Sequence, residues 1–335
     1  MKNTHTSLFD LHGCVVEFRS SDREVAEWIA ADFSAFKAAP GSLPVISITA
    51  ETGAPGPGLP RAVLRTKKWH ILPSRAGTRA VWYPEGALCE YDYRADRGHI
   101  SSPDRHLLKE LSYLLILSRA GEALDRRGLH RLHAGALGFK GKALLFCGAQ
   151  AAGKTTLILE LLKDRSFSLL SDDTPLISRA GIVHGFPLRI GLGCDSPHLP
   201  GLSRTRGFLR RHYPPKRLLD IGVAGLEISP ALPPAFIFKL RRGIGPCLLA
   251  PAAGEASGEL AASLVAGCGV PQMAEYFLRP SPADIARKVK ITASRLKAAG
   301  ALLRRTSFRI FETGPDHVAN AAALKAFLRS SSAAG

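Results

Sequence analysis

A glycine-rich segment near the middle of the chain has the residue types and spacing of a phosphate-binding loop. It is a glycine, four further residues and then Gly-Lys-Thr, and it comprises Gly148, Ala149, Gln150, Ala151, Ala152, Gly153, Lys154 and Thr155. Glycines let the backbone turn tightly, so that successive amide groups point at phosphate oxygens in front of a helix N-terminus. In such a loop the lysine reaches the β- and γ-phosphates and the threonine hydroxyl binds Mg²⁺. We therefore expect a nucleotide site here, with Thr156 as a packing residue or a second phosphate contact.

An acidic pair, Asp172 and Asp173, ends the apolar segment SLLS that follows the loop and its helix. A pair this early in the chain is expected to lie on a strand near the loop and beside the γ-phosphate. Two carboxylates there can divide the work, because one can accept the proton of an attacking hydroxyl while the other holds the metal. The alternative is that both aspartates only cap the turn before Thr174 and Pro175.

His133 precedes the loop in the segment RLHAGALGF, which is typical of a strand. Its imidazole could hydrogen-bond a phosphate or a carboxylate, although a single histidine on a strand is more often structural. The residues alone leave both readings open.

The elements that must position these residues form two blocks. Residues 1–127 contain a strand near Cys14 to Phe18, then a helix, then short alternating segments. This pattern predicts a small antiparallel sheet with one helix. A long helix with Pro103 in its first turn is expected to follow the sheet. Residues 128–335 contain strand, loop, helix and strand, which is the context that a phosphate-binding loop requires. We expect an N-terminal α+β domain for recognition or assembly and a C-terminal α/β catalytic domain.

Taken together, His133, the loop and the acidic pair resemble the HPr serine kinase/phosphorylase family, and in particular the HPr-kinase-related proteins found with peptide-modification gene sets such as those of lasso peptides. The resemblance covers residues 129–179. It implies a P-loop kinase core like that of HPr kinase and phosphoenolpyruvate carboxykinase, with ATP and Mg²⁺ as cofactors. It also implies transfer of the γ-phosphoryl group to a serine or threonine hydroxyl, and a homo-oligomer, since the family forms ring-like hexamers.

The resemblance assigns roles to individual residues. Lys154 corresponds to the phosphate-binding lysine, Thr155 to the metal-binding hydroxyl and Asp172 to the aspartate that accepts the proton. Asp173 corresponds to the next acidic residue, here expected to bind the metal, and His133 to the family's histidine. The family's Glu-x-Arg-Gly segment is not reproduced, because Pro187 stands in the place of the glutamate in FPLRIGLG. The resemblance therefore does not extend to reverse phosphorolysis or to recognition of HPr itself.

The chain carries 45 Lys and Arg against 28 Asp and Glu, and the resulting charge of +17 attracts polyanions. Part of this charge lies in Arg204 to Arg217, a segment expected to be a basic loop. It could close over the triphosphate, bind an acidic acceptor, bind single-stranded nucleic acid by stacking, or be merely solvated. A second basic segment, near residues 283–299, is expected to be a helix with Ile285, Val289 and Leu296 turned inward. Six widely spaced cysteines argue against a zinc ribbon and against a disulfide framework.

No stretch has the length of a signal peptide or of a membrane span, so we expect a cytoplasmic protein without membrane contact. The function expected from the sequence is an ATP-dependent kinase acting on a Ser or Thr hydroxyl of a peptide or protein. Two alternatives remain: a kinase for a small molecule such as free serine, and a nucleotide-binding regulatory or nucleic-acid-binding module without transferase activity.

Overall fold

The structure, a computed structural model, describes residues 4–56, 58–149, 152–199, 205–277, 279 and 281–333. The chain is mixed α/β and divides into two compact units. The first unit comprises Met1–Arg127, Gly207–Lys216 and Pro271–Arg287, and the second comprises Gly128–Arg206, Arg217–Val270 and Lys288–Gly335. The sequence placed a boundary after residue 127; the structure adds two short later segments to the first unit.

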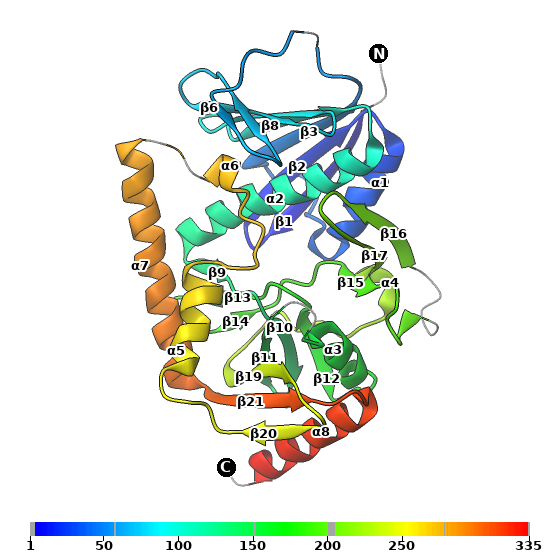
Figure 1. Ribbon diagram of the computed structural model, residues 1–335, viewed down its shortest axis with the longest axis vertical. Helices are drawn as coiled ribbons and strands as arrows, with labels where there is room; N and C mark the ends of the chain where they lie inside the picture. The colour runs from blue at the N-terminus through cyan, green and yellow to red at the C-terminus, as the bar shows by residue number, and fades with distance from the viewer. Residues whose placement is uncertain are drawn as a thin grey trace. The chain divides into compact units, whose positions relative to one another are not determined.

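The first unit is built on one sheet of eight strands, drawn in blue and cyan in Figure 1. In order across the sheet they are β1 (His5–Leu11), β2 (Cys14–Ser20), β3 (Ile46–Thr52), β8 (Arg97–Ser102), β7 (Ala87–Asp92), β6 (Thr78–Tyr83), β5 (His70–Leu72) and β4 (Leu64–Arg65). The strand β3 runs parallel to both β2 and β8, and the other pairs are antiparallel. The prediction of a small antiparallel sheet is therefore wrong at these two pairs, although the other five pairs are antiparallel. Helix α1 (Arg23–Asp32) connects β2 to β3, and a strand–helix–strand crossover joins parallel strands.

Helices α1 and α2 (Arg105–Arg127) pack on this sheet and on each other, so the expectation of a single helix on the sheet is also wrong. The Asp104 carboxylate accepts hydrogen bonds from the backbone N–H groups of His106 (2.7 Å) and Leu107 (3.4 Å), which caps the N-terminus of α2. Pro103 thus precedes the cap. The prediction that Pro103 lies in the first helical turn is therefore wrong.

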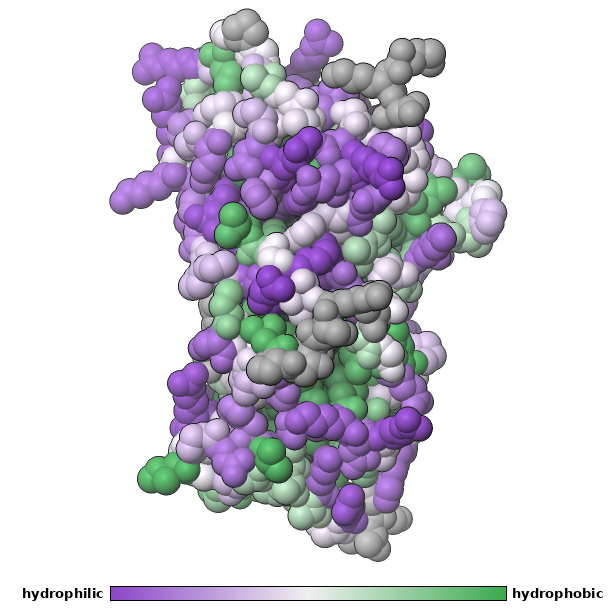
Figure 2. Space-filling model, turned by 90° about the vertical axis from the view of Figure 1, so that its right-hand side faces the viewer, coloured by the Kyte–Doolittle hydropathy of each residue, from purple (hydrophilic) through white to green (hydrophobic). Residues whose placement is uncertain are grey.

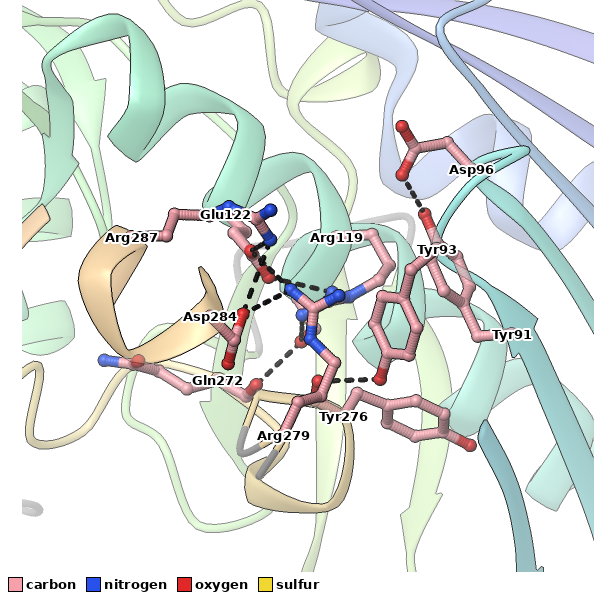
Figure 3. A network of polar contacts seen from close by, with 11 residues as sticks. Tyr91, Tyr93, Asp96, Arg119, Glu122, Gln272, Tyr276, Arg279, Asp284 and Arg287 are labelled. Atoms are coloured by element: carbon pink, nitrogen blue, oxygen red, sulfur yellow. Dashed lines mark hydrogen bonds and ion pairs between the residues drawn. The ribbon is translucent and has the colours of Figure 1, made fainter. Parts of the chain in front are cut away.

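A buried ionic network fixes the segment Pro271–Arg287 to α2 (Figure 3). Arg119 Nη1 lies 2.9 Å from Glu122 Oε2, and both side chains are at most 5% exposed. Arg279 extends from the later segment to within 3.3 Å of Glu122, and its guanidinium lies 4.0 Å from the ring centre of Tyr93. Buried charges are tolerated only when they are paired, so this network explains why a segment so late in the chain belongs to the first unit.

The second unit contains a six-stranded sheet that carries the predicted phosphate-binding loop. Its strands, in order across the sheet, are β12 (Phe167–Ser171), β10 (Gly135–Phe139), β11 (Lys142–Cys147), β19 (Pro234–Arg242), β21 (Ser307–Thr313) and β20 (Cys247–Leu249). Helices α3 (Lys154–Leu162) and α8 (His317–Ala333) contribute Leu157 and Leu324 to the core on one face. Helices α5 (Glu255–Leu260) and α7 (Pro282–Arg305) contribute Leu260 and Leu302 to the core on the other.

The segment RLHAGALGF, expected to be one strand, is divided between two sheets. Its first residue, Arg131, ends β9 (Leu129–Arg131), which pairs with β13 (Leu176–Ser178) in a four-stranded sheet completed by β14 (Val183–His184) and β18 (Ala231–Leu232). Its second part is β10 in the six-stranded sheet. His133 therefore lies in the connection between two strands, where a side chain is freer to turn toward a site than inside a ladder.

The basic segment Arg204–Arg217 is not a loop in its described part. It forms β16 (Thr205–Arg210) and β17 (Tyr213–Leu219), which join β15 (Ile190–Gly193) in a three-stranded sheet, and α4 (Ile221–Ala224) follows. The helix expected near residues 283–299 is α7, but its predicted inward face is wrong: Ile285, Val289 and Leu296 are 56–63% exposed. The face toward the core instead carries Ile291, Ala298 and Leu302.

The face of the molecule shown in Figure 2 is mostly polar, with apolar side chains scattered among charged ones. Across the described residues, the structure has no helix with both the length and the apolar character needed to cross a membrane.

Three of the six cysteines are buried and three are exposed, which predicts a selective reaction with alkylating reagents. Burial raises the pKa of Cys14 to about 11 and the pKa values of Cys89 and Cys147 to about 12. At pH 8 at most about a thousandth of such thiols is ionised, and the thiolate is the reactive form. We expect iodoacetamide to modify Cys194, Cys247 and Cys268 in the native protein and all six in denaturant, as measured by peptide mass mapping. Rapid native modification of Cys147 would contradict the burial of the strand that leads into the loop.

Candidate active site

The predicted phosphate-binding loop joins the end of β11 to the start of α3, and this strand–loop–helix order is the one that the sequence predicted. Gly148 has φ +139°, and a Cβ added there would lie 2.8 Å from the carbonyl oxygen of Leu240. Gly153 has φ +88° and is the N-cap of α3. Both conformations are ones that other residues rarely adopt, which explains why glycines stand at these two positions. Gln150 and Ala151, two of the residues expected to bind phosphate, lie outside the described residues.

Lys154 lies at the first position of α3 and its side chain folds back over the loop. Its Nζ donates hydrogen bonds to the carbonyl oxygens of Gly148 (2.7 Å) and Ala149 (3.1 Å). Thr155 and Thr156 follow in the first helical turn and are half-buried, and Ala152 is buried. The first turn of a helix has backbone N–H groups without intrahelical acceptors, so this end of α3 favours anions.

The sheet order brings the three sequence elements to one edge. Strand β10 lies between β11 and β12 and is antiparallel to both, so the last residues of β11 and β12 lie beside the start of β10. In this register Gly135 pairs with Phe146 and Ala136 pairs with Ser171. The loop therefore leaves the sheet on one side of β10 and the pair Asp172–Asp173 leaves it on the other. A Cβ on Gly135 would lie 2.2 Å from Ile158 Cδ1 and 3.1 Å from the Asp172 carbonyl oxygen, so a glycine there permits this close approach.

His133 lies against the acidic pair. Its Nδ1 is 3.3 Å from Asp173 Oδ1, and the backbone N–H of Ala134 donates to the Asp173 carbonyl oxygen at 3.0 Å. Gly269 packs on the imidazole, since a Cβ there would lie 2.6 Å from the ring. Burial lowers the pKa of His133 below 6.5, although the negative charge of Asp173 opposes this shift. Burial thus favours the neutral imidazole, in which one nitrogen can donate a hydrogen bond and the other can accept one.

The two aspartates differ in exposure. Asp172 is half-buried at the sheet edge, whereas 57% of the Asp173 side chain is exposed. The structure forms no cluster of three or more His, Cys, Asp or Glu side chains suited to a metal among its described residues. This donor set nevertheless fits Mg²⁺ bound together with a nucleotide, because Mg²⁺ typically takes one or two carboxylates and completes its octahedron with phosphate oxygens and water. Thr155 and Asp173 are the residues that would hold it.

A second charged group lies beside the loop, and the sequence analysis missed it. Strand β19 runs parallel to β11, with Lys239 in register with Cys147, the residue just before Gly148. Lys239 Nζ lies 3.1 Å from Glu255 Oε1 and 3.2 Å from Glu259 Oε2. Burial of Lys239 acts against its charge, but the hydrogen bonds to both glutamates outweigh it and raise the pKa of the lysine. The spacing of the glutamates, four residues apart on a helix, was visible in the sequence, but their lysine partner was not.

The arginines of the basic hairpin have partners within the protein. Arg206 forms an ion pair with Asp220, and Arg217 Nε donates to the Thr205 hydroxyl at 3.0 Å. Arg210 donates to the carbonyl oxygen of Pro214, and the backbone N–H of Arg211 donates to Glu110 Oε2 at 3.1 Å. These contacts stabilise the hairpin itself, and the Asp220 carboxylate offsets the charge of Arg206. The residue Arg204 lies outside the described residues.

Comparison of the sequence with models of protein families finds no match, and comparison with curated proteins finds none either. We therefore infer the function from the geometry of this site and from the residues that form it.

Proposed function

We propose that this protein is an ATP- and Mg²⁺-dependent kinase of the HPr-kinase-like type, which transfers the γ-phosphoryl group to a Ser or Thr hydroxyl of a peptide or protein. The second unit would then be its P-loop kinase core. The observation that carries the proposal is the shared sheet edge, where the loop after β11, the acidic pair after β12 and His133 before β10 converge. A loop that suits phosphates and two carboxylates at the same edge are the kinds of group that phosphoryl transfer uses.

In this proposal each residue has a defined task. The loop amides and Lys154 bind the β- and γ-phosphates, and Thr155 and Asp173 hold Mg²⁺, which offsets the negative charge of the phosphates. Asp172 accepts the proton as the substrate oxygen forms its bond to the γ-phosphorus and the bond from that phosphorus to the β–γ bridging oxygen breaks, releasing ADP. His133 positions the Asp173 carboxylate through the 3.3 Å contact.

The test is incubation of the full chain with γ-³²P-ATP, Mg²⁺ and a panel of synthetic peptides that contain Ser or Thr, followed by mass mapping. We expect label on a Ser or Thr hydroxyl of a peptide, and none with the Lys154→Ala variant. Label on free serine in a parallel reaction, with none on any peptide, would instead indicate a small-molecule kinase. Nucleotide binding with no transfer, together with salt-sensitive binding of RNA or DNA, would refute the kinase and favour a regulatory module.

A further inference from the structure

The first unit has a pocket of about 720 Å³ that the proposed active site does not use. Along β2, Val16 and Phe18 point into the core while Arg19 points to the opposite face of the sheet, and the neighbouring strands alternate in the same way. The pocket lies on this opposite face, and the turn between β5 and β6 lines it as well, through Pro73, Ser74 and Arg75.

The floor of the pocket consists of two rows of side chains that run across five strands, from β2 to β6. The first row, in register, is Glu17, Ser47, Arg97, Asp92 and Thr78. The second row is Arg19, Thr49, His99, Glu90 and Ala80. All ten residues line the pocket, so the chemistry of its floor is set by the strand register.

The charges in these rows are arranged by strand. Strand β3 offers two hydroxyls, β8 offers Arg97 and His99, and β7 offers Glu90 and Asp92. At the β2 side, the Glu17 carboxylate is largely buried and accepts hydrogen bonds from Arg19 (2.7 Å) and Ser47 (3.1 Å). The guanidinium of Arg97 on β8 thus lies beside the carboxylates of β7, with hydrogen-bonding groups next to them.

This arrangement selects among possible ligands. A simple anion would meet the carboxylates of Glu90 and Asp92, and a simple cation would meet Arg97 and Arg75. An apolar ligand would have to strip water from all of these groups without replacing their hydrogen bonds. A ligand with groups of both signs is complementary to the floor.

The length of the floor indicates the size of the ligand. Neighbouring strands lie about 4.8 Å apart, so the distance from β2 to β6 is about 19 Å. An extended peptide covers about 3.3 Å per residue, which corresponds to about six residues. We propose that this pocket docks a short extended peptide segment with side chains of both signs, in the peptide or protein that carries the acceptor hydroxyl. The acceptor part of this inference rests on the proposed function, but peptide binding can be tested without it.

The probe is the fluorescein-labelled hexapeptide Lys-Glu-Lys-Glu-Lys-Glu, titrated against the full chain by fluorescence anisotropy at low salt. We expect saturable binding that weakens as salt is added. Arg97→Ala and Glu90→Ala should each weaken it about tenfold, because each removes one charge-assisted contact. Arg94→Ala is the matched control, since Arg94 is exposed in the turn between β7 and β8 and does not line the pocket. Retained thermal stability in each variant excludes unfolding as the cause.

The competing ligands are further arms of the same titration. Equal binding of inorganic phosphate or hexaglutamate, with no effect of Glu90→Ala, would show an anion site and overturn the inference. If the dipeptide Lys-Glu binds with the same affinity as the hexapeptide, the pocket is a site for a small zwitterion. If Arg94→Ala weakens hexapeptide binding as much as Arg97→Ala does, the attraction is non-specific. Either result also overturns the inference.

The two proposals can fail separately. Lys154→Ala should leave hexapeptide binding unchanged, because the hexapeptide has no phosphate. With whichever peptide is phosphorylated in the labelled-ATP assay, Arg97→Ala should raise KM about tenfold and leave kcat unchanged. An unchanged KM would contradict docking of the acceptor even if the kinase activity is real.

Discussion

Lys154→Ala is expected to weaken ATP binding about 30- to 150-fold and to remove measurable turnover. The ammonium is the one side-chain cation within the loop, and a charge-assisted hydrogen bond to phosphate contributes about 2–3 kcal/mol. Its Nζ now bonds to the carbonyl oxygens of Gly148 and Ala149, so it lies over the loop within reach of a bound phosphate. Isothermal titration calorimetry with ATP and Mg²⁺ measures the affinity directly.

The matched control for this variant is Lys163→Ala. Lys163 lies at the other end of α3, is 60% exposed and pairs with Glu160, so its removal takes away the same charge at a distance from the loop. The control should bind ATP as the wild type does. If the wild type and Lys154→Ala bind ATP with equal affinity, this lysine does not contribute to nucleotide binding.

Asp172→Asn is expected to keep ATP binding and to lose phosphoryl transfer by a factor of about 100 or more. Asparagine has nearly the same shape, so the sheet edge stays packed, but its amide cannot accept the proton of the incoming hydroxyl as a carboxylate does. The measurement needs both quantities from the same preparation: the rate of label transfer at saturating ATP, and the dissociation constant of ATP.

The variant for comparison is Asp173→Asn, because it removes the same charge from the neighbouring residue. If Asp173 holds the metal, its variant should recover activity as the Mg²⁺ concentration is raised, whereas Asp172→Asn should not. Transfer at the wild-type rate in Asp172→Asn would falsify the assignment of this residue as the general base. If the activity of Asp172→Asn instead recovers as the Mg²⁺ concentration is raised, Asp172 is the metal-binding residue and Asp173 is the general base.

Much of the loop could be predicted from the sequence. Gly148 and Gly153 have the positive φ values that a tight phosphate-binding turn requires, and the elements on both sides, β11 and α3, match the predicted strand and helix. The acidic pair was correctly placed after a strand, β12. Each of these features depends on residues close together in the chain, so local pattern and backbone preference are sufficient to predict them.

The details around His133 could not be predicted in the same way. The segment RLHAGALGF has the alternation of one strand, yet it serves two sheets and leaves His133 between them. Likewise Ile285, Val289 and Leu296 have helical spacing and are exposed, because the core covers another face of α7. Periodicity indicates that a face is apolar, but it does not say which neighbour, if any, will cover it.

The sequence by itself determined the local chemistry of this protein: a glycine turn that suits phosphate, a lysine and a threonine at a helix start, and two aspartates at the end of a strand. Only the tertiary structure decided which strands are neighbours. It placed β10 between β11 and β12, brought Lys239 beside the loop, and aligned Arg97 with Ser47 and Asp92 across the other sheet. The reason is that strand order and register arise from hydrogen bonds and packing between residues far apart in the chain, and a period of two residues is compatible with many such pairings.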